Sequence, residues 1–244
     1  MDPQRFEQIC AQILASPQRQ DGIGTLGEKT MHAVLKHYFE PHTQNHEIKI
    51  GGYVADIVGE DGIIEIQTRQ FDRLRKKLTA FLQVCDVTIV HPIPHVKWLS
   101  WIDPDTGAVT KKRKSPKVGT PCDIFRELYK IKPLLHDPHL HLCIVLVDVE
   151  EYRYLNGWSA DRKKGSSRCD RVPVGIVEEL YLYSIEDYRK LLPAALPTPF
   201  TSKDLSKAAK ISISCAQTAL NILFSLGIVE RVGKKKNAYL YQLT

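Results

Sequence analysis

The residues of this chain that are best suited to chemistry are two acidic side chains in the segment from Val54 to Gln67. Apolar and polar residues alternate on each side of Gly59–Gly62, which predicts two strands joined by a four-residue turn. In that hairpin Asp56 lies directly opposite Glu65, and opposed side chains share one face of a sheet, about 5 Å apart. Like charges so placed destabilise a sheet, and a bound divalent cation removes the penalty. The open alternative is an exposed face whose carboxylates are separated by water.

The hairpin lies within a stretch where predicted helices and strands alternate, which is the pattern of an α/β fold. Strand directions are mixed, because a short turn such as Gly51-Gly52 joins antiparallel neighbours. Residues 140–149 form a nearly continuous apolar run, typical of a strand covered on both faces. Residue spacing predicts helices over 26–39, 71–83 and 121–131, strands over 46–50, 53–58, 63–67 and 87–92, and a hairpin between 95–103 and 108–112.

The acidic pair and the order of elements around it resemble the PD-(D/E)xK nuclease superfamily over about residues 20–92. Members carry Asp on one strand and Glu-x-Lys on the next, and here Asp56, Glu65 and Gln67 occupy those positions. Glu28 matches the glutamate that many members carry on the first helix. The resemblance implies a restriction endonuclease-like mixed sheet flanked by helices, with Mg²⁺ or Mn²⁺ bound by Asp56, Glu65 and Glu28.

The implied activity is metal-dependent hydrolysis of DNA by an endodeoxyribonuclease. Gln67 stands where the superfamily has lysine, and an amide can orient water but cannot take up a proton. Lys29, Arg69 or a second metal ion are candidates for the missing function. Because inactive members of the superfamily also lose the lysine, a catalytically inactive DNA-binding or regulatory protein stays open as the alternative. The implied catalytic residues are Glu28, Asp56, Glu65 and Gln67.

Three basic stretches are suited to contact with nucleic-acid phosphates. The first stretch follows the predicted hairpin. The other two are residues 111–117 and 161–171, which are too polar for a core and are expected to be loops. The competing interpretations are solvated charge runs and, for 111–117, a nuclear localisation signal. The residues predicted to contact DNA here are Arg69, Arg73, Lys111, Lys112, Arg113, Lys114, Lys163, Lys164 and Arg168.

The chain from residue 196 onward is predicted to be a small domain of its own. Three prolines between Pro193 and Pro199 interrupt the preceding pattern, and residues 199–244 carry seven basic and two acidic side chains. A short helix with Thr201 or Ser202 as N-cap, a second helix and a hairpin with the loop GKKKN follow one another, which resembles a winged helix-turn-helix domain. Some winged helices bind only proteins, but the positive charge favours DNA.

The second of these helices would be the recognition helix. Its apolar spacing predicts that Ile213, Ala216, Leu220, Leu223 and Phe224 face the core. The resemblance implies that the opposite side enters a DNA groove and that the hairpin lysines contact phosphates. The residues predicted to do so are Ser214, Gln217, Thr218, Asn221, Lys234, Lys235 and Lys236.

The composition, with 43% hydrophobic and 25% charged residues, excludes a disordered chain. Neither a membrane span of roughly 18 apolar residues nor a secretory signal is recognisable. The six cysteines include no CxxC pair and are expected to be reduced thiols. We therefore expect a cytoplasmic protein, nucleoid-associated if bacterial, that binds DNA and no membrane. A homodimer is compatible with cleavage of both strands, although no segment requires one. The expected domains are 1–195, with the nuclease-like core at about 20–92, and 196–244.

Overall fold

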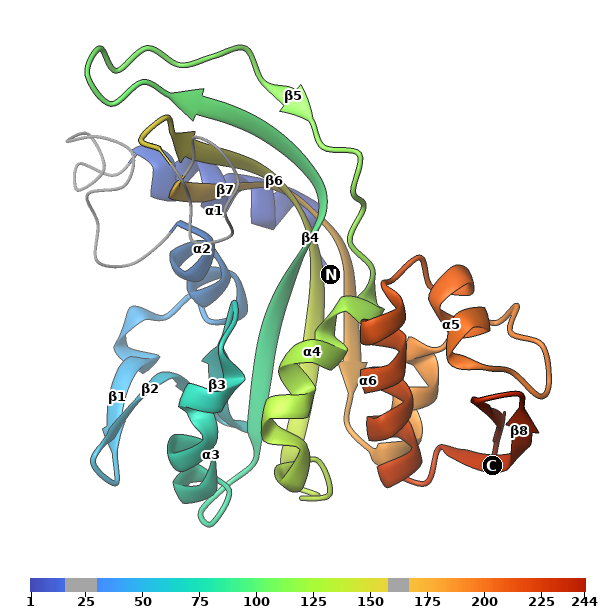
Figure 1. The fold of residues 1–244 in the computed structure, drawn as a ribbon. Helices are drawn as coiled ribbons and strands as arrows, with labels where there is room; N and C mark the ends of the chain where they lie inside the picture. Colours follow the sequence, from blue (N-terminus) through green and yellow to red (C-terminus); the bar gives the residue numbers. More distant parts are fainter. Residues whose placement is uncertain (16–29, 158–166) are drawn as a thin grey trace. The chain divides into compact units, whose positions relative to one another are not determined.

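The computed structural model describes residues 1–15, 30–157 and 167–244. Within those residues the chain has the predicted α/β fold, a mixed seven-stranded sheet flanked by helices (Figure 1). Neighbouring strands follow the order β1-β2-β3-β4-β6-β7, with β5 paired to β4, while β8 and β9 form a separate two-stranded sheet. The strands are β1 (His46–Ile50), β2 (Tyr53–Gly59), β3 (Gly62–Ile66), β4 (Val87–Ile102), β5 (Arg113–Lys114), β6 (Leu140–Tyr154), β7 (Ser167–Leu182), β8 (Val229–Lys235) and β9 (Ala238–Leu243).

The helices are short, and several are 3-10 helices (η). The α-helices are α1 (Pro3–Ala15), α2 (Thr30–Phe39), α3 (Arg75–Phe81), α4 (Phe125–Leu128), α5 (Ser202–Ala208) and α6 (Ile213–Ser225). The 3-10 helices are η2 (Thr43–Asn45), η3 (Phe71–Leu74), η4 (Pro121–Ile124), η5 (Tyr129–Leu134) and η6 (Ile185–Leu191). None of the helices in the described part of the chain combines the length and apolar character needed to cross a membrane.

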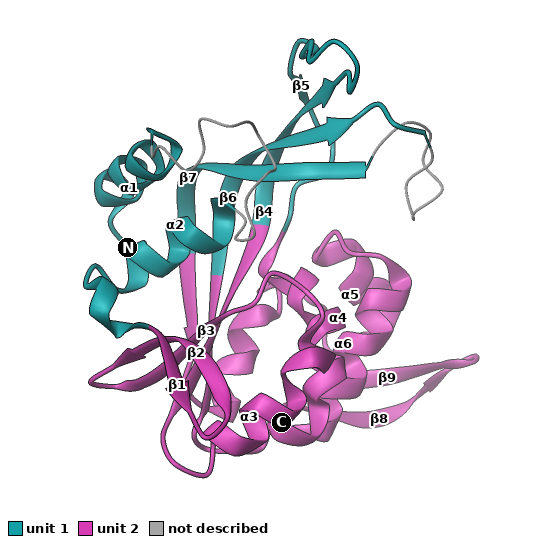
Figure 2. Cartoon of the chain, turned by 90° about the vertical axis from the view of Figure 1, so that its left-hand side faces the viewer, with its two compact units in different colours: residues 1–46, 94–119, 145–178 teal, residues 47–93, 120–144, 179–244 magenta. Residues whose placement is uncertain are grey.

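The chain comprises two compact units, which Figure 2 colours separately. The predicted hairpin and the C-terminal segment both belong to unit 2, so their surroundings are described within that unit. The predicted division into domains 1–195 and 196–244 stays a prediction. Unit 1 consists of Met1–His46, Pro94–Gly119 and Val145–Glu178, and unit 2 of Glu47–Ile93, Thr120–Ile144 and Glu179–Thr244.

The hairpin of β2 and β3 has the predicted register. Its antiparallel partners are Ile57↔Ile64, Val58↔Ile63 and Gly59↔Gly62, so the predicted four-residue turn is confirmed. β3 then pairs in parallel with β4, from Ile63↔Val87 to Ile66↔Val90. β3 is therefore held on both sides, which fixes the position of Glu65 in the sheet.

Gly62 is required by the turn of this hairpin. Its φ is +112°, and a Cβ built there would overlap the backbone carbonyl oxygen of Asp86, which accepts a hydrogen bond from the N–H of Ile63 at 2.9 Å. We expect Gly62→Ala to lower the free energy of unfolding by about 2–3 kcal/mol, because the backbone is strained and the Asp86 strand end must move. Urea unfolding of Gly59→Ala is the control, since a Cβ at Gly59 would make only an ordinary contact at 4.0 Å. Equal losses for the two variants would contradict this role of Gly62.

One strand of the sheet differs from the prediction. Residues 87–92 and 95–103 were expected to be separate strands, but β4 is continuous over Val87–Ile102. Pro92 and Pro94 predict a break in the strand. They lie between the part of β4 that pairs with β3 and the part that pairs with β5. Between those parts, this edge of β4 has no partner strand that needs an N–H donor, so proline is tolerated there. The expected hairpin forms in part, since Ile102 and Val109 form an antiparallel bridge and the N–H of Thr110 donates to the carbonyl of Trp101 at 2.9 Å. The bounds of its second strand are wrong, because β5 is Arg113–Lys114 and not 108–112.

Burial in the sheet follows the predicted pattern in β6. The predicted apolar run is almost fully buried from Leu142 to Val147, as expected for a strand covered on both faces. In unit 1, α1 packs against α2, where the Phe6 ring meets Tyr38 edge-on at 5.3 Å. All six cysteines are free thiols, five of them buried.

In unit 2 the helices pack in a series. η3 contacts α3, α4 and η5, α4 contacts α6, and α6 contacts α5 and β8. Phe125 and Leu128 of α4 are fully buried, as are Ala219 and Ile222 of α6. The C-terminal segment is therefore part of the apolar core of unit 2.

Candidate functional site

The two predicted metal-binding carboxylates lie together at the open end of the β2–β3 ladder. Beyond the pair Ile57↔Ile64, two backbone N–H groups donate to side chains of the facing strand. The N–H of Asp56 donates to Oε1 of Glu65 at 3.3 Å, and the N–H of Ile66 donates to Oδ2 of Asp56 at 2.8 Å. Each carboxylate thus reaches across to the facing strand. The register, continued by one residue, sets Asp56 opposite Glu65, and opposed side chains share one face of a sheet.

Glu65 is not on an exposed sheet face. Its exposed fraction is 1%, which removes the alternative of carboxylates separated by bulk water. Oε2 of Glu65 accepts a hydrogen bond from Nζ of Lys77 on α3 at 2.6 Å. The Lys77 ammonium also lies over the ring of Phe81, 5.7 Å from its centre. A half-buried cation is therefore fixed next to the buried carboxylate.

The pKa of Glu65 is raised to about 7. Burial is the largest cause, and the charge of Asp56 adds to it, while Lys77 lowers the pKa by a smaller amount. The carboxyl group therefore changes its charge near neutral pH, in the range where a general acid or a general base has to change its protonation state.

Raising the pH should weaken the fold through Glu65. Below its unfolded pKa of about 4.5, Glu65 is protonated in both states. As the pH rises through about 7, the folded protein must ionise a buried carboxyl, so stability present at low pH is lost. Between pH 5 and pH 8 we expect the stability of Glu65→Gln relative to the wild type to rise by on the order of 3 kcal/mol, measured by urea unfolding.

The control for this pH effect is Glu60→Gln, in the exposed turn of the same hairpin. Its stability relative to the wild type should change by less than about 0.5 kcal/mol over the same range. A flat difference for Glu65→Gln would show that Glu65 is ionised throughout and would contradict the raised pKa.

Gln67, at the motif's lysine position, is tied to the chain around it. Its Nε2 donates to the carbonyl of Arg69 and, at 3.4 Å, to that of Gln70. The backbone carbonyl of Gln67 accepts a hydrogen bond from Nδ1 of the buried His91 at 2.6 Å. The amide nitrogen therefore holds the turn that leads into η3.

Glu28 and Lys29 lie outside the described residues, so their predicted roles stay predictions. In the part of the chain that is described, no group of three or more His, Cys, Asp and Glu side chains could hold a metal ion. The hairpin itself supplies two carboxylates, which are hard oxygen donors of the kind that Mg²⁺ uses together with water and phosphate.

Lys77 is the residue of this site that the sequence interpretation did not single out. In the sequence Lys77 is one of five cations in the basic stretch that follows the hairpin, and the other four are exposed. Lys77 lies three residues after Leu74 and four before Phe81, both of which are buried. That spacing places it on the inner side of the helix, and this signal distinguishes it from Lys76. The exposed cations of the cluster are Arg69, Arg73, Arg75 and Lys76.

The two other predicted basic stretches lie in unit 1 as far as they are described. Lys111, Lys112, Arg113 and Lys114 are exposed, and Lys112 pairs with Glu150 at 2.6 Å. Lys163 and Lys164 lie outside the described residues. Arg168 belongs to β7, so the prediction of a loop through residues 167–171 is wrong.

The C-terminal segment has the predicted order of a short helix, a second helix and a hairpin. Thr201 is the N-cap of α5 and forms a capping box with Asp204, while the Ser212 side chain accepts from the N–H of Cys215 at 3.2 Å to cap α6. β8 and β9 pair in antiparallel fashion from Val229↔Leu243 to Lys235↔Ala238.

The buried side of α6 is rotated from the predicted one. Ala216, Leu220 and Leu223 are buried as expected, but Ile213 and Phe224 are 43% and 42% exposed. Cys215, Ala219 and Ile222 are buried instead, because α6 also packs on α4 and η5. The Phe224 ring is covered by the guanidinium of Arg231, 4.4 Å from its centre.

The predicted DNA-contacting side of α6 is partly occupied by unit 2 itself. Ser214, Gln217 and Asn221 are exposed, and Thr218 is half-buried. Asn221 accepts a hydrogen bond from Nζ of Lys132 at 2.8 Å, and Ser212 accepts from Nη2 of Arg126 at the same distance. These contacts place two further cations beside the helix.

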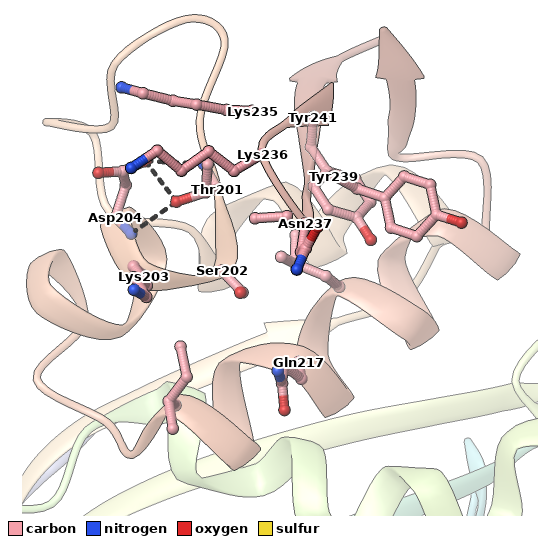
Figure 3. Close-up of a pocket in the computed structure, with 13 residues that line it drawn as sticks. Thr201, Ser202, Lys203, Asp204, Gln217, Lys235, Lys236, Asn237, Tyr239 and Tyr241 are labelled. Carbon is pink, nitrogen blue, oxygen red and sulfur yellow. Dashed lines mark hydrogen bonds between the residues drawn. The ribbon is translucent and has the colours of Figure 1, made fainter. Parts of the chain in front are cut away.

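A groove of about 710 Å³ lies between α5, α6 and the turn of β8 and β9 (Figure 3). Gln217 lines it from α6, Ser202 and Lys203 from α5, and Lys235 and Lys236 from the hairpin. The ammonium of Lys234 lies 4.9 Å from the centre of the Tyr239 ring and does not line the groove. Amides, hydroxyls and three lysines line the groove together with one carboxylate, that of Asp204, which is held by Thr201. The amides, hydroxyls and lysines are donors suited to phosphate oxygens.

Removing the groove lysines should flatten the salt dependence of DNA binding. We expect Lys235→Gln/Lys236→Gln to lower the slope of log K against log salt by up to about 1.8, at about 0.9 for each phosphate contact. The measurement is fluorescence anisotropy with a duplex at several salt concentrations. The control is Lys207→Gln/Lys210→Gln, two exposed lysines of the same segment that do not line the groove. Equal changes in the two variants would contradict a contact in the groove.

Comparison with known proteins gives a family and a relative. Residues 29–183 match the family described as a domain of unknown function (DUF8091). Over 227 residues the chain is 30% identical to an uncharacterized protein of Treponema pallidum (strain Nichols), an alignment that covers 90% of this chain and 87% of that protein. No solved structure matches the chain significantly.

Proposed function

For this chain, which belongs to the DUF8091 family, we propose metal-dependent hydrolysis of DNA phosphodiester bonds at the β2–β3 hairpin. The observation that carries the proposal is the meeting of Asp56 and the buried Glu65 on one side of the hairpin, with Lys77 2.6 Å from the Glu65 carboxylate. Two carboxylates and a lysine are the side chains that the PD-(D/E)xK motif brings together.

The order of elements supports a restriction endonuclease-like core. α2 precedes the meander β1-β2-β3, and α3 leads to β4, which lies parallel to β3. This is the helix, meander, helix and strand order of the superfamily. Asp56 on β2 and Glu65 on β3 occupy the motif positions in that order.

Asp56 and Glu65 would hold Mg²⁺ or Mn²⁺, with Glu28 as a further ligand. When bound, such an ion neutralises charge on the scissile phosphate and lowers the pKa of a coordinated water. The protein contributes the placement of both carboxylates, since each accepts a backbone N–H from the facing strand and cannot rotate freely. Mg²⁺ commonly takes one or two carboxylates and completes its shell with water and phosphate, which fits this donor set.

Lys77 would take over the role of the missing motif lysine. Gln67 carries no charge, whereas the Lys77 ammonium is fixed beside Glu65 and remains 18% exposed. A cation there can orient water by donating a hydrogen bond and can stabilise the negative charge that develops on the phosphate during hydrolysis. Water adds across the P–O bond, which leaves a phosphate on one strand end and a hydroxyl on the other.

The C-terminal segment would recruit duplex DNA as a winged helix. The order α5, α6, β8, β9 and the lysines that line the groove support this assignment. Lys235 and Lys236 would contact phosphates, and Gln217 would face the duplex. DNA is then the partner, in the cytoplasm or on a bacterial nucleoid, and a homodimer would bring one hairpin to each strand.

One observation favours the second candidate, a catalytically inactive DNA-binding protein. Both oxygens of Glu65 are already engaged, Oε1 by the N–H of Asp56 and Oε2 by Lys77. A carboxylate so compensated needs no metal ion, and the fold would persist after turnover was lost. Binding through the C-terminal groove would then be the whole activity.

The two candidates are separated by one experiment on the full chain. Purified protein is incubated with plasmid, linear, branched and single-stranded DNA, with Mg²⁺, Mn²⁺ or EDTA. Cutting of any substrate that requires the divalent ion supports the nuclease. Tight binding without cutting of any substrate supports the DNA-binding protein and overturns the proposed hydrolysis.

A further inference from the structure

A second cluster of charged side chains lies entirely within unit 1. At its centre is Glu151 on β6, whose side chain is fully buried. Oε1 of Glu151 is 2.5 Å from Nη2 of Arg153, and Oε2 is 2.6 Å from Nε of Arg171 and 3.8 Å from Nε of Arg168. Three guanidinium groups from two neighbouring strands thus surround one carboxylate.

A lysine from a third strand belongs to the same cluster. Lys97 of β4 interacts electrostatically with Glu151 and with all three arginines. Burial and the positive charge of those arginines lower the pKa of Lys97, although Glu151 raises it. Burial alone would raise the pKa of Glu151, but Arg171, Lys97 and Arg153 outweigh it and lower that pKa to about 2. The direction of the Glu151 pKa shift shows that the surrounding cations outweigh its burial, while for the pKa of Lys97 burial is the largest cause.

The cationic face continues onto β5. Arg113 is the cross-strand partner of Leu99, and Lys97 lies two residues before Leu99. Because opposed residues and alternate residues of a strand share a face, Arg113 lies on the same face as Lys97. β5 pairs with β4, β4 neighbours β6, and β6 neighbours β7. With strands about 4.8 Å apart, the three spacings between these four strands give the row an extent of about 14 Å across the sheet.

This arrangement differs from an ordinary buried ion pair. Among the described residues, four cations interact electrostatically with Glu151. The neighbouring carboxylate, Asp170, accepts hydrogen bonds from the hydroxyl of Thr30 and, at 2.7 Å, from the backbone N–H of Arg171. Arg153, Arg168 and Arg171 keep 21%, 31% and 23% of their side-chain surface exposed, so an anion from solvent can reach them. Partly desolvated guanidinium groups bind phosphate oxygens in a planar, bidentate manner.

We infer that the row Arg113, Lys97, Arg153, Arg168 and Arg171, defined here as the unit 1 cation row, binds phosphate groups of an extended anion. About 14 Å matches the rise of roughly four nucleotides of one strand, or the reach of a free polyphosphate, and exceeds a single phosphate. Glu151 orients Arg153 and Arg171 and leaves the row with a net positive charge. The inference is independent of cleavage at the hairpin, since all of its residues belong to unit 1.

The test compares two double variants of the full chain, one that changes the row and one that leaves it intact. Lys97→Gln/Arg113→Gln removes two cations of the row, and Lys207→Gln/Lys210→Gln removes two exposed cations that belong neither to the row nor to the groove. Tripolyphosphate binding is measured by calorimetry, and binding of a fluorescent twelve-nucleotide oligothymidylate by anisotropy, both at constant ionic strength. We expect at least a tenfold loss of affinity for the first variant and less than a twofold change for the second. Tighter binding of the oligonucleotide identifies a nucleic-acid strand as the source, and tighter binding of tripolyphosphate a free phosphorylated molecule.

Equal losses in the two double variants, or no loss in either, would overturn the inference. If Lys97→Gln/Arg113→Gln fails to fold by circular dichroism, Arg168→Gln replaces it, because Arg168 makes the longest of the three contacts with Glu151. We expect at least a threefold loss for that variant, and an unchanged affinity would again overturn the inference. Both affinities are measured in EDTA, without a divalent ion, which separates binding at this row from cleavage at the proposed nuclease site.

Discussion

Asp56→Asn and Glu65→Gln are each expected to lower the rate of DNA cleavage by at least about 10³-fold, equivalent to about 4 kcal/mol of transition-state stabilisation. Each substitution keeps the size of the side chain and removes a charged oxygen ligand from a pair that meets on one side of the hairpin. A divalent ion supplies several kcal/mol of charge stabilisation, which is lost with its ligands. Single-turnover cleavage of a saturating duplex is the measurement.

The matched control is Asp61→Asn, in the exposed turn between the same two strands. It removes the same charge from the hairpin and should leave cleavage within about threefold. DNA affinity in EDTA should be similar for all three variants, because the groove lies on other elements of unit 2. If Asp56→Asn and Glu65→Gln still cut at the wild-type rate, the hairpin is not the site of hydrolysis.

Lys77→Met should lower cleavage by about 10²-fold or more, within the range that a positioned proton donor or acceptor contributes. The methionine keeps the apolar length of the side chain over Phe81 but removes the ammonium that lies 2.6 Å from Glu65. Lys77 lowers the pKa of Glu65, so its loss should also move the acidic limb of the pH–rate profile to higher pH. Rates between pH 5.5 and 9 measure both effects.

Two companions test whether Lys77 replaces the motif lysine. Lys76→Met removes the neighbouring, exposed cation and should change the rate by less than about threefold. Gln67→Lys in the Lys77→Met background returns a cation to the motif position and should recover at least about tenfold. A wild-type rate for Lys77→Met would remove Lys77 from the proposed mechanism, and failure of the rescue would show that the two positions are not equivalent.

The hairpin was predictable from sequence because its information is local. Alternating residues around Gly59 and Gly62 set the register, and that register, continued by one residue, places Asp56 opposite Glu65. The α/β class and the order of elements in the C-terminal segment follow from patterns of similar range. These features depend on residues within about ten positions of one another.

Other features depend on contacts that no local pattern encodes. In the sequence, Lys77 is one cation of a charge run, and only the position of α3 in the fold brings its ammonium to Glu65. Pro92 and Pro94 predict a break in the strand, and only the pairing of the two parts of β4 with different strands shows that both prolines fit within it. The rotated face of α6 arises because α4 and η5 cover its second side, and those residues come almost 90 positions earlier. The polar stretch around Arg168 predicts a loop, whereas Arg168 belongs to β7 and lies beside Glu151.

The turn at Gly59–Gly62 has a consequence for the way this family can vary. Side chains alternate along a strand, so inserting or deleting one residue in the turn would send one of the two acids to the reverse of the sheet. Gly62 leaves little room for such a change, since the Asp86 carbonyl occupies the adjacent space. Family members that keep the acidic pair should therefore also keep the eight residues that separate Asp56 from Glu65, whatever their identity. Insertions and deletions among family members should therefore occur in loops other than this turn.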